Sequence, residues 1–234
     1  MKELIYGDSQ SGKTGKRLEA ILQQQGADVK RVTKSGKSSG ALLQIAKEYD
    51  FAADGFGRVW LFFGGNDGAL TVGKTLKVRQ LVEYFRDAGA EVVAIGLPPA
   101  TLITDQTLAK KVWGAKASEP DWFASHTMPS REERNKAYRK EVEALAGEGG
   151  PAVWYADVRE APVTGAVKQP SGVVFPSQPD GIHVSDPTAT EVAQWLADGG
   201  FKTLSQAGGG GSGSGWAKLA LGVAAAWAVG RAIS

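Results

Sequence analysis

The 234-residue sequence contains no cysteine and only two histidines. The missing thiols exclude disulfide bonds, thiolate metal sites and a cysteine nucleophile, but they leave the redox compartment open. Any imidazole chemistry therefore depends on His126 or His183. His126 lies in a polar stretch between Trp122 and Ser130, where we expect a solvated loop residue. We expect no metal and no organic cofactor.

The chain also lacks an excess of charge and an N-terminal hydrophobic stretch. Its 27 basic and 25 acidic residues leave a formal net charge of +2, which gives no strong field for nucleic acid. The segment Met1 to Tyr6 runs directly into Gly7-Asp8-Ser9, without an apolar stretch long enough for a secretory signal. We therefore expect no nucleic-acid partner and no classical signal-peptide export.

Short apolar runs alternate with amphipathic stretches along the chain. Such runs are typical of parallel strands, because helices cover both faces of a parallel sheet. The predicted strands are Glu3–Tyr6, Val29–Val32, Arg58–Phe63, Glu91–Leu97 and Ala152–Val158. The pattern predicts an α/β fold, a three-layer, doubly wound sandwich around a parallel five-stranded sheet. Sheets of this kind place their sites at the carboxyl ends of the strands.

Helices are predicted between and after these strands. They are Lys16–Gln25, Lys74–Ala88, a helix that begins at Ser130, and a helix from Asp186-Pro187 to Gly199-Gly200. The hydroxyl of Ser130 is predicted to cap the third helix while Glu133 reaches back, which is a capping box. Its apolar face then carries Tyr138, Val142 and Leu145.

Composition divides the chain into three parts. Residues 1–204 are predicted to form the globular domain, and residues 205–215 a flexible Gly/Ser linker, since the run from Gly208 to Gly215 has no side chains able to bury surface. Residues 216–234 form an apolar segment in which only Lys218 and Arg231 are charged. Charges near its two ends suit snorkelling, so we predict a membrane or virion-type assembly anchor, with a free solvated helix as the alternative.

Residues of three types are suited to acyl transfer by serine. Ser9 comes where the first strand turns into the first helix, so its hydroxyl is expected at the carboxyl edge of the sheet. Asp180 and His183 are separated by two residues, close enough for the carboxylate to accept a hydrogen bond from the imidazole. That bond would fix the tautomer and leave the far ring nitrogen facing Ser9.

Four short blocks, in a fixed order, resemble the SGNH/GDSL hydrolase family. They are Gly7-Asp8-Ser9, Ser35-Gly36-Lys37-Ser38, Gly64-Gly65-Asn66-Asp67 and Asp180-Gly181-Ile182-His183. The loop Gly96-Leu97-Pro98-Pro99 also looks like the family's turn after the fourth strand. Two departures are Gln10 in place of the frequent leucine and the lack of an asparagine before Gly36.

The resemblance implies a flavodoxin-like sheet and a role for each block. Ser9 would be the nucleophile, His183 the base and Asp180 the group that orients the base. The oxyanion hole would be formed by the backbone N–H groups of Ser9 and Gly36 and the side chain of Asn66. The substrate class implied is a carboxylic ester of a small molecule or glycan, with O-acetyl groups of a cell-envelope glycan as the first hypothesis.

Two other functions compete with the esterase interpretation. Gly7–Thr14 fits the G-x-x-x-x-G-K-[ST] phosphate loop, and Val153–Asp157 resembles the acidic strand of an NTPase. That alternative leaves the third and fourth blocks unexplained and makes Lys13 the phosphate ligand, whereas the esterase makes Lys13 a solvated helix residue. The other alternative is a non-catalytic structural or virion component with the same fold.

The segment Val112–Met128 has aromatic residues without a clean helical or strand period. Trp113, Trp122 and Phe123 lie between the third and fourth blocks. We consider two hypotheses for this segment, a lid or acyl-side wall of the site, and an irregular loop that packs its aromatic side chains on the domain.

Overall fold

The computed structural model describes residues 1–99, 106–120, 122, 126–169, 172–176, 180 and 182–205. Backbone contacts group Met1–Lys202 into one compact unit and Thr203–Ser234 into a second. The predicted linker beyond Ser205 and the predicted anchor at 216–234 lie outside the described residues, so both stay predictions. Within the described ranges, no helix is long and apolar enough to cross a membrane.

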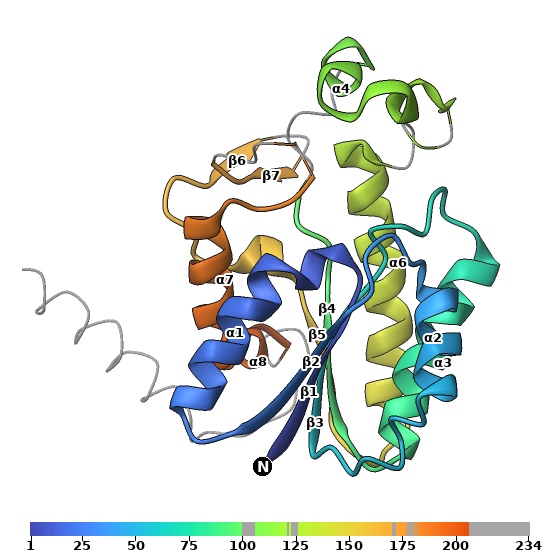
Figure 1. Ribbon diagram of the computed structural model, residues 1–234, viewed down its shortest axis with the longest axis vertical. Coiled ribbons are helices and arrows are strands. Elements are labelled where there is room, and N and C mark those ends of the chain that lie inside the picture. The colour runs from blue at the N-terminus through green and yellow to red at the C-terminus, as the bar shows by residue number, and fades with distance from the viewer. Residues whose placement is uncertain are drawn as a thin grey trace, which may run out of the picture. The chain divides into compact units, whose positions relative to one another are not determined.

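Five parallel strands form the central sheet of the first unit (Figure 1). They are β1 (Lys2–Gly7), β2 (Asp28–Thr33), β3 (Arg58–Phe62), β4 (Glu91–Ile95) and β5 (Val153–Ala156). Their order is β2-β1-β3-β4-β5, and every neighbouring pair is parallel. All five predicted strands and the doubly wound topology are confirmed. The order reverses between β1 and β3, which is where such sheets open a crevice at their carboxyl ends.

Helices cover both faces of the sheet and give the predicted three layers (Figure 1). One face carries α1 (Lys13–Gln24), α7 (Asp186–Ala197) and α8 (Gly200–Ser205), and the other carries α2 (Ser39–Glu48), α3 (Val72–Asp87) and α6 (Met128–Ala146). Successive strand residues point to opposite faces, so each strand feeds two cores. In β1, Leu4 and Tyr6 pack under α2, α3 and α6, whereas Ile5 packs under α1 and α7.

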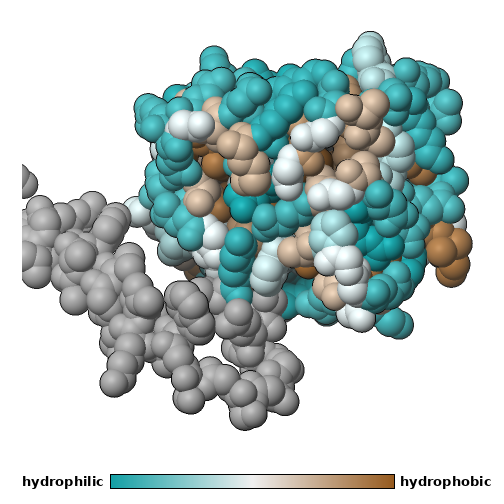
Figure 2. All heavy atoms as spheres, turned by 90° about the horizontal axis from the view of Figure 1, so that it is seen from below, coloured by the Kyte–Doolittle hydropathy of each residue, from teal (hydrophilic) through white to brown (hydrophobic). Residues whose placement is uncertain are grey.

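The remaining elements lie near the carboxyl edge of the sheet. They are η1 (Ser9–Ser11), α4 (Gln106–Trp113), η2 (Gly114–Ser118), η3 (Val158–Glu160) and the antiparallel pair β6 (Val167–Gln169) and β7 (Gly172–Val174). Helix α4 and the β6–β7 pair lie beyond the strand ends in Figure 1. The opposite, amino-edge face is a mosaic of hydrophilic and apolar residues (Figure 2).

The start of α6 corrects a sequence prediction. Ser130 does not cap this helix, because the helix already begins at Met128. The cap is Thr127, whose hydroxyl accepts a hydrogen bond from the Ser130 N–H at 3.4 Å. Pro129 explains the earlier start, since proline is favoured in a first helical turn, where its missing N–H is not needed. The structure also adds α2, capped by Ser38, which the sequence did not predict.

Gly7, at the end of β1, generates the first prediction. A Cβ at this position would lie 2.1 Å from the Phe62 carbonyl oxygen of the neighbouring strand β3. Backbone atoms cannot yield as a flexible side chain does, so Gly7→Ala should lower the free energy of unfolding by at least about 1–3 kcal/mol. Urea unfolding curves measure the change.

Gly73→Ala is the matched control for Gly7→Ala. Gly73 lies in the first turn of α3, and the nearest atom to its added Cβ is the Thr71 hydroxyl at 4.0 Å. Alanine is the better helix former, so this variant should keep or raise the stability. Equal destabilisation by both substitutions would contradict the close contact of β1 with β3.

Candidate active site

The turn after β1 presents Ser9 at the carboxyl edge, and Asp8 holds that turn in place. Asp8 is fully buried, and its Oδ1 accepts a hydrogen bond from the Gln10 N–H at 2.9 Å. Its Oδ2 accepts the Gly65 N–H, also at 2.9 Å. Burial raises the pKa of Asp8 to about 6, although these two bonds and the charge of Arg131 act to lower it. One carboxylate therefore joins the Ser9 turn to the loop that carries Asn66.

Ser9, His183 and Asp180 form a continuous chain of hydrogen bonds. The Nε2 atom of His183 lies 3.0 Å from the Ser9 hydroxyl, and its Nδ1 lies 2.7 Å from Asp180 Oδ2. The side chains of His183 and Asp180 are 27% and 28% exposed, so solvent or a ligand can reach them. The fold thus brings together residues that are 174 positions apart in the sequence.

The second oxygen of Asp180 shapes the backbone around the imidazole. Oδ1 accepts the N–H groups of Ile182 and His183 at 2.9 and 2.7 Å. Burial acts to raise the pKa of Asp180, but the hydrogen bonds from the His183 ring and from these two N–H groups outweigh it and lower the pKa to about 2. Asp180 is consequently an anion at neutral pH, which favours a proton on His183 Nδ1 and leaves Nε2 free to accept one.

The Asn66 loop follows β3 and is fixed by buried hydrogen bonds. Both oxygens of Asp67 accept from Ser39 at the start of α2, from its N–H at 2.6 Å and from its hydroxyl at 2.7 Å. The Tyr138 hydroxyl also donates to Asp67, at 2.7 Å. Next to this anchor, the Asn66 Nδ2 atom is buried without a hydrogen-bond partner among the described residues. A buried amide donor left unpaired marks a place where a ligand acceptor would be stabilised.

Gly36 lies in the exposed turn between β2 and α2, with φ +72°. That conformation favours glycine and places the turn at the same sheet edge as Ser9. Within the described part of the chain, however, no hydrogen bond joins Gly36 to Ser9, Asn66 or His183. Its predicted contribution to an oxyanion hole therefore stays a prediction.

A cavity of about 230 Å³ opens beside the Ser9–His183 pair. It is lined by Ser9, Gln10, Gly12, Lys13, Asp180, His183 and Val184. The described residues contain no cluster of three or more side chains that could hold a metal ion. The groups that face this space include a hydroxyl, an imidazole and a surface lysine, which are groups of the kinds that acyl transfer uses.

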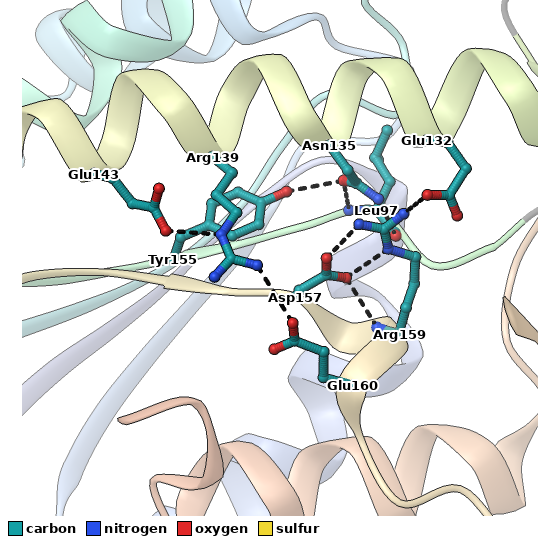
Figure 3. A network of polar contacts seen from close by, with 9 residues as sticks. All are labelled: Leu97, Glu132, Asn135, Arg139, Glu143, Tyr155, Asp157, Arg159 and Glu160. Carbon is teal, nitrogen blue, oxygen red and sulfur yellow. Dashed lines mark hydrogen bonds and ion pairs between the residues drawn. The ribbon is translucent and has the colours of Figure 1, made fainter. Parts of the chain in front are cut away.

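The turn that carries Ser9 does not form a phosphate cradle. A phosphate loop needs several backbone N–H groups that point at one anion. Here the N–H of Ser11 donates to the Asp8 carbonyl at 3.1 Å, and that of Gly12 to the Ser9 carbonyl at 3.0 Å. Lys13 lies 3.7 Å from Asp186 on the surface. The acidic residue of the NTPase alternative, Asp157, is bound by Arg159 (Figure 3).

His126 corrects a second sequence prediction, because it is buried and not solvated. Only 7% of the residue is exposed, its ring stacks on Trp122 at 4.3 Å, and its Nδ1 lies 2.7 Å from the Trp122 carbonyl oxygen. Burial lowers the pKa of His126 to about 4, so the ring is neutral at physiological pH. The sequence prediction failed because polar neighbours in sequence do not reveal aromatic packing in space.

Part of the aromatic segment Val112–Met128 contacts the loop that carries Asp180 and His183. The indole N–H of Trp113 donates to the Asp180 carbonyl at 2.9 Å, and its ring lies 6.1 Å from that of His183. Trp113 and Trp122 pack with Ile182 in a small separate core. Phe123 lies outside the described residues. These contacts agree with a loop that packs on the domain, while a lid that opens and closes stays a prediction.

Sequence analysis missed three buried polar residues of α6, namely Arg131, Arg134 and Asn135, which are 1%, 0% and 0% exposed. The charged run from Arg131 to Arg134 resembles a solvated helix face. A signal did exist, since positions 131, 134 and 135 share one helix face with Tyr138, whose burial was predicted.

Solved structures share this fold, although no protein-family model and no curated protein sequence matches the chain. A carbohydrate esterase of family 3 from Talaromyces cellulolyticus is 13% identical with a TM-score of 0.53, and the match covers 88% of this chain and 99% of that one. A structure titled TesA is 18% identical with a TM-score of 0.51 over 84% and 97% of the two chains. An acetyl esterase crystallised with an acetate ion is 14% identical with a TM-score of 0.50 over 88% and 99%.

These similarities concern the fold. The chain shares the doubly wound α/β fold of these solved structures, which agrees with the fold that its sequence predicts. Because folds of this kind carry different functions, the activity has to be argued from the site of this chain.

The low pKa of Asp180 predicts how stability responds to acid. The pKa is about 2 in the folded chain against an ordinary 3.8, so ionised Asp180 stabilises the folded state above about pH 4, and this contribution is lost as the pH falls through 2. Asp180→Asn should therefore lower the free energy of unfolding at pH 6 by on the order of 1 kcal/mol, with a smaller difference at pH 2.5.

Urea unfolding at both pH values measures that change. Asp28→Asn, at an exposed position of β2, is the control and should leave stability unchanged at either pH. A destabilisation by Asp180→Asn that is equal at pH 6 and pH 2.5 would show that the substitution acts through packing and not through the charge.

Proposed function

We propose that this chain is a serine ester hydrolase in which Ser9 is the nucleophile, His183 the general base and Asp180 the group that orients the base. The observation that carries this proposal is the unbroken chain from the Ser9 hydroxyl through both ring nitrogens of His183 to Asp180, at 3.0 and 2.7 Å. Nucleophile, base and orienting carboxylate in that order are the minimum machinery for acyl transfer by serine.

The first half of the reaction transfers the acyl group to Ser9. His183 Nε2 takes the proton of the Ser9 hydroxyl as Oγ bonds to the carbonyl carbon of the ester, whose π electrons move to oxygen. The tetrahedral intermediate then expels the alcohol oxygen, which takes the same proton from His183. The products of this half are an acyl-Ser9 ester and a free alcohol.

Water completes the cycle by the same route. His183 removes a proton from water as its oxygen attacks the acyl carbon, and the second tetrahedral intermediate releases Ser9, which recovers the proton. Asp180, ionised throughout, stabilises the imidazolium that forms in each half. The sum is an ester and water converted to a carboxylic acid and an alcohol, with no further reactant.

Stabilisation of the oxyanion is assigned to Asn66 and to the backbone N–H of Ser9, with the Gly36 N–H as the third predicted donor. The unpaired, buried Nδ2 of Asn66 supports this assignment, because a donor held ready before the charge develops needs no reorganisation during the reaction. The hydrogen bond of Asp8 to Gly65 keeps this loop next to the Ser9 turn.

A small acyl group on a polar alcohol is the substrate that we propose, with O-acetyl groups of a glycan as the specific case. The cavity beside Ser9 has about 230 Å³, and Gln10, Lys13 and His183 in its lining offer hydrogen-bonding groups to the hydroxyls of a sugar unit. Two of the proteins with this fold are titled a carbohydrate esterase and an acetyl esterase, which supports the same choice.

Covalent labelling tests the mechanism. A serine-directed phosphonate should label Ser9 and block turnover of p-nitrophenyl acetate, and Ser9→Ala should abolish both labelling and turnover without unfolding the chain. Ser118→Ala, at an exposed serine of η2, is the matched control and should keep both. Turnover that survives in Ser9→Ala, or a wild-type chain that is neither labelled nor active, would refute the proposal in favour of a non-catalytic role.

The proposed substrate is tested with p-nitrophenyl esters of different acyl-chain length and with esters of a glycan. The value of kcat/KM should be highest for p-nitrophenyl acetate and at least about tenfold lower for the octanoate, since the proposed substrate carries a small acyl group. To test whether O-acetyl groups of a glycan are hydrolysed, acetate release is measured with a chemically O-acetylated glycan. The same polymer after deacetylation is the control. A preference for octanoate would overturn the small-acyl proposal and leave the hydrolase mechanism intact.

A further inference from the structure

The buried face of α6 changes its chemistry along the helix. Its C-terminal half buries Val142 and Leu145, as the outer layer of an α/β sandwich normally does. Its N-terminal half buries Arg131 and Arg134 on the same side of the helix. A buried guanidinium loses several kcal/mol of hydration, which apolar residues at these positions would avoid. Two such residues at the site end of α6 therefore require an explanation other than core packing.

Arg134 holds the start of the Asn66 loop. Its Nη1 donates to the Gly64 carbonyl at 2.7 Å, and Gly64 is two residues before Asn66. The guanidinium is itself steadied by a bond from Nε to the Ser130 carbonyl at 3.4 Å. Gly64 has φ +88°, and a Cβ there would lie 2.7 Å from the Tyr138 ring, so the loop passes directly over α6.

Arg131 holds the loop that carries the base. Its Nη1 donates to the Ile182 carbonyl at 3.2 Å and to the Pro98 carbonyl at 2.8 Å, and Ile182 directly precedes His183. The Nε and Nη2 atoms of Arg131 are buried and have no hydrogen-bond partner among the described residues. This side chain thus gives its directed bonds to two backbone carbonyls of the site.

Neighbouring carboxylates keep both arginines charged. Burial lowers the pKa of Arg131 to about 9, and the repulsion of Arg134 adds to this, while Asp8 and Asp180 act in the opposite direction. Burial also lowers the pKa of Arg134, and the charges of Asp67 and Asp8 counter it. Both guanidinium groups consequently remain donors at neutral pH.

The next residue of the same face extends the pattern to the loop after β4. Asn135 accepts the Leu97 N–H at 2.8 Å and donates to the Leu97 carbonyl at 3.0 Å, and the Tyr155 hydroxyl donates to Asn135 at 2.9 Å (Figure 3). The loops after β3 and β4, the strand β5 and the loop that carries His183 are therefore all attached to one helix. A helix is stiff over this length, so it can serve as a common frame for loops that are mobile when left alone.

We propose that Arg131 and Arg134 are positioning residues of the site: Arg134 sets the Asn66 loop, Arg131 sets the His183 loop, and α6 fixes the distance between the two. Neither side chain touches the reacting atoms. The kinetic part of this inference rests on the proposed esterase function. A residue that only positions other groups affects the rate of reaction, because a shift of about 1 Å in a reacting group can lower the rate about 100-fold.

A double-mutant cycle with Asn66→Ala distinguishes the two arginines. Arg134→Met should lower kcat about 10- to 100-fold with little change in KM, but no more than about threefold when Asn66 is already alanine. Arg131→Met should lower kcat by the same factor with or without Asn66, because it acts through His183. Arg139→Met is the matched control on α6, where Arg139 pairs with Glu143 and Glu160 at the surface (Figure 3), and should leave kcat unchanged.

Hydrogen exchange tests the same assignment without any ester turnover. Arg134→Met should speed exchange of the Gly65 N–H about tenfold, and Arg131→Met that of the His183 N–H, while the core amide of Ile5 is unaffected in either variant. Arg134→Lys and Arg131→Lys serve as second variants if the methionine variants do not fold. Lysine keeps one donor, so smaller effects on the same amides are expected.

The outcomes separate the two proposals. Suppose that each arginine variant changes exchange only in its own loop, while the wild-type chain hydrolyses no ester. That result would refute the proposed function and uphold the positioning role. Two results in an active chain would overturn the positioning role alone. One is an equal reduction of kcat by Arg134→Met with Asn66 present and with Asn66→Ala. The other is faster amide exchange in both loops and at Ile5 when either arginine is replaced.

Discussion

One buried carboxylate, Asp8, receives backbone N–H groups from two different strand ends, Gln10 after β1 and Gly65 after β3. The geometry of the site depends on this bridge, because it joins the turn that carries Ser9 to the loop that carries Asn66. Gly65 makes it possible, since a Cβ there would lie 2.7 Å from the carboxylate. Burial raises the pKa of Asp8, so this carboxylate adds little to the stability of the fold. An aspartate at this position is therefore explained by the geometry of the site and not by core packing.

Charge balance extends this constraint across the carboxyl edge of the sheet. Three carboxylates, on Asp8, Asp67 and Asp180, surround the two buried guanidinium groups of α6. In a medium of low polarity each charge is tolerated only near its opposite, so removal of one member leaves the others uncompensated. The C-terminal half of α6 buries Val142 and Leu145, which are apolar and need no compensating charge.

Sequence patterns predicted the sheet and the proximity of Ser9, Asp180 and His183, because both leave a direct trace in the sequence. Buried strands are apolar runs, and Ser9, Asp180 and His183 lie in short blocks whose spacing is chemical. Arg131 and Arg134 left no such trace, since a charged run such as theirs is ordinarily solvated, and only their helical spacing from Tyr138 records the burial. Ser130 and His126 were misjudged for a similar reason: Pro129 moved the helix start, and stacking on Trp122 is a contact that local polarity does not encode.

Packing of α1 against α7 joins an early helix of the compact unit to a late one, and the hydrogen bond between Ser9 and His183 spans 174 positions of sequence. During synthesis on the ribosome, Ser9 is therefore made 174 residues before His183. A chain that stops short of residue 180 contains Ser9 without either partner of its hydrogen-bond chain. Under the proposed function, ester hydrolysis therefore requires synthesis to continue at least through His183.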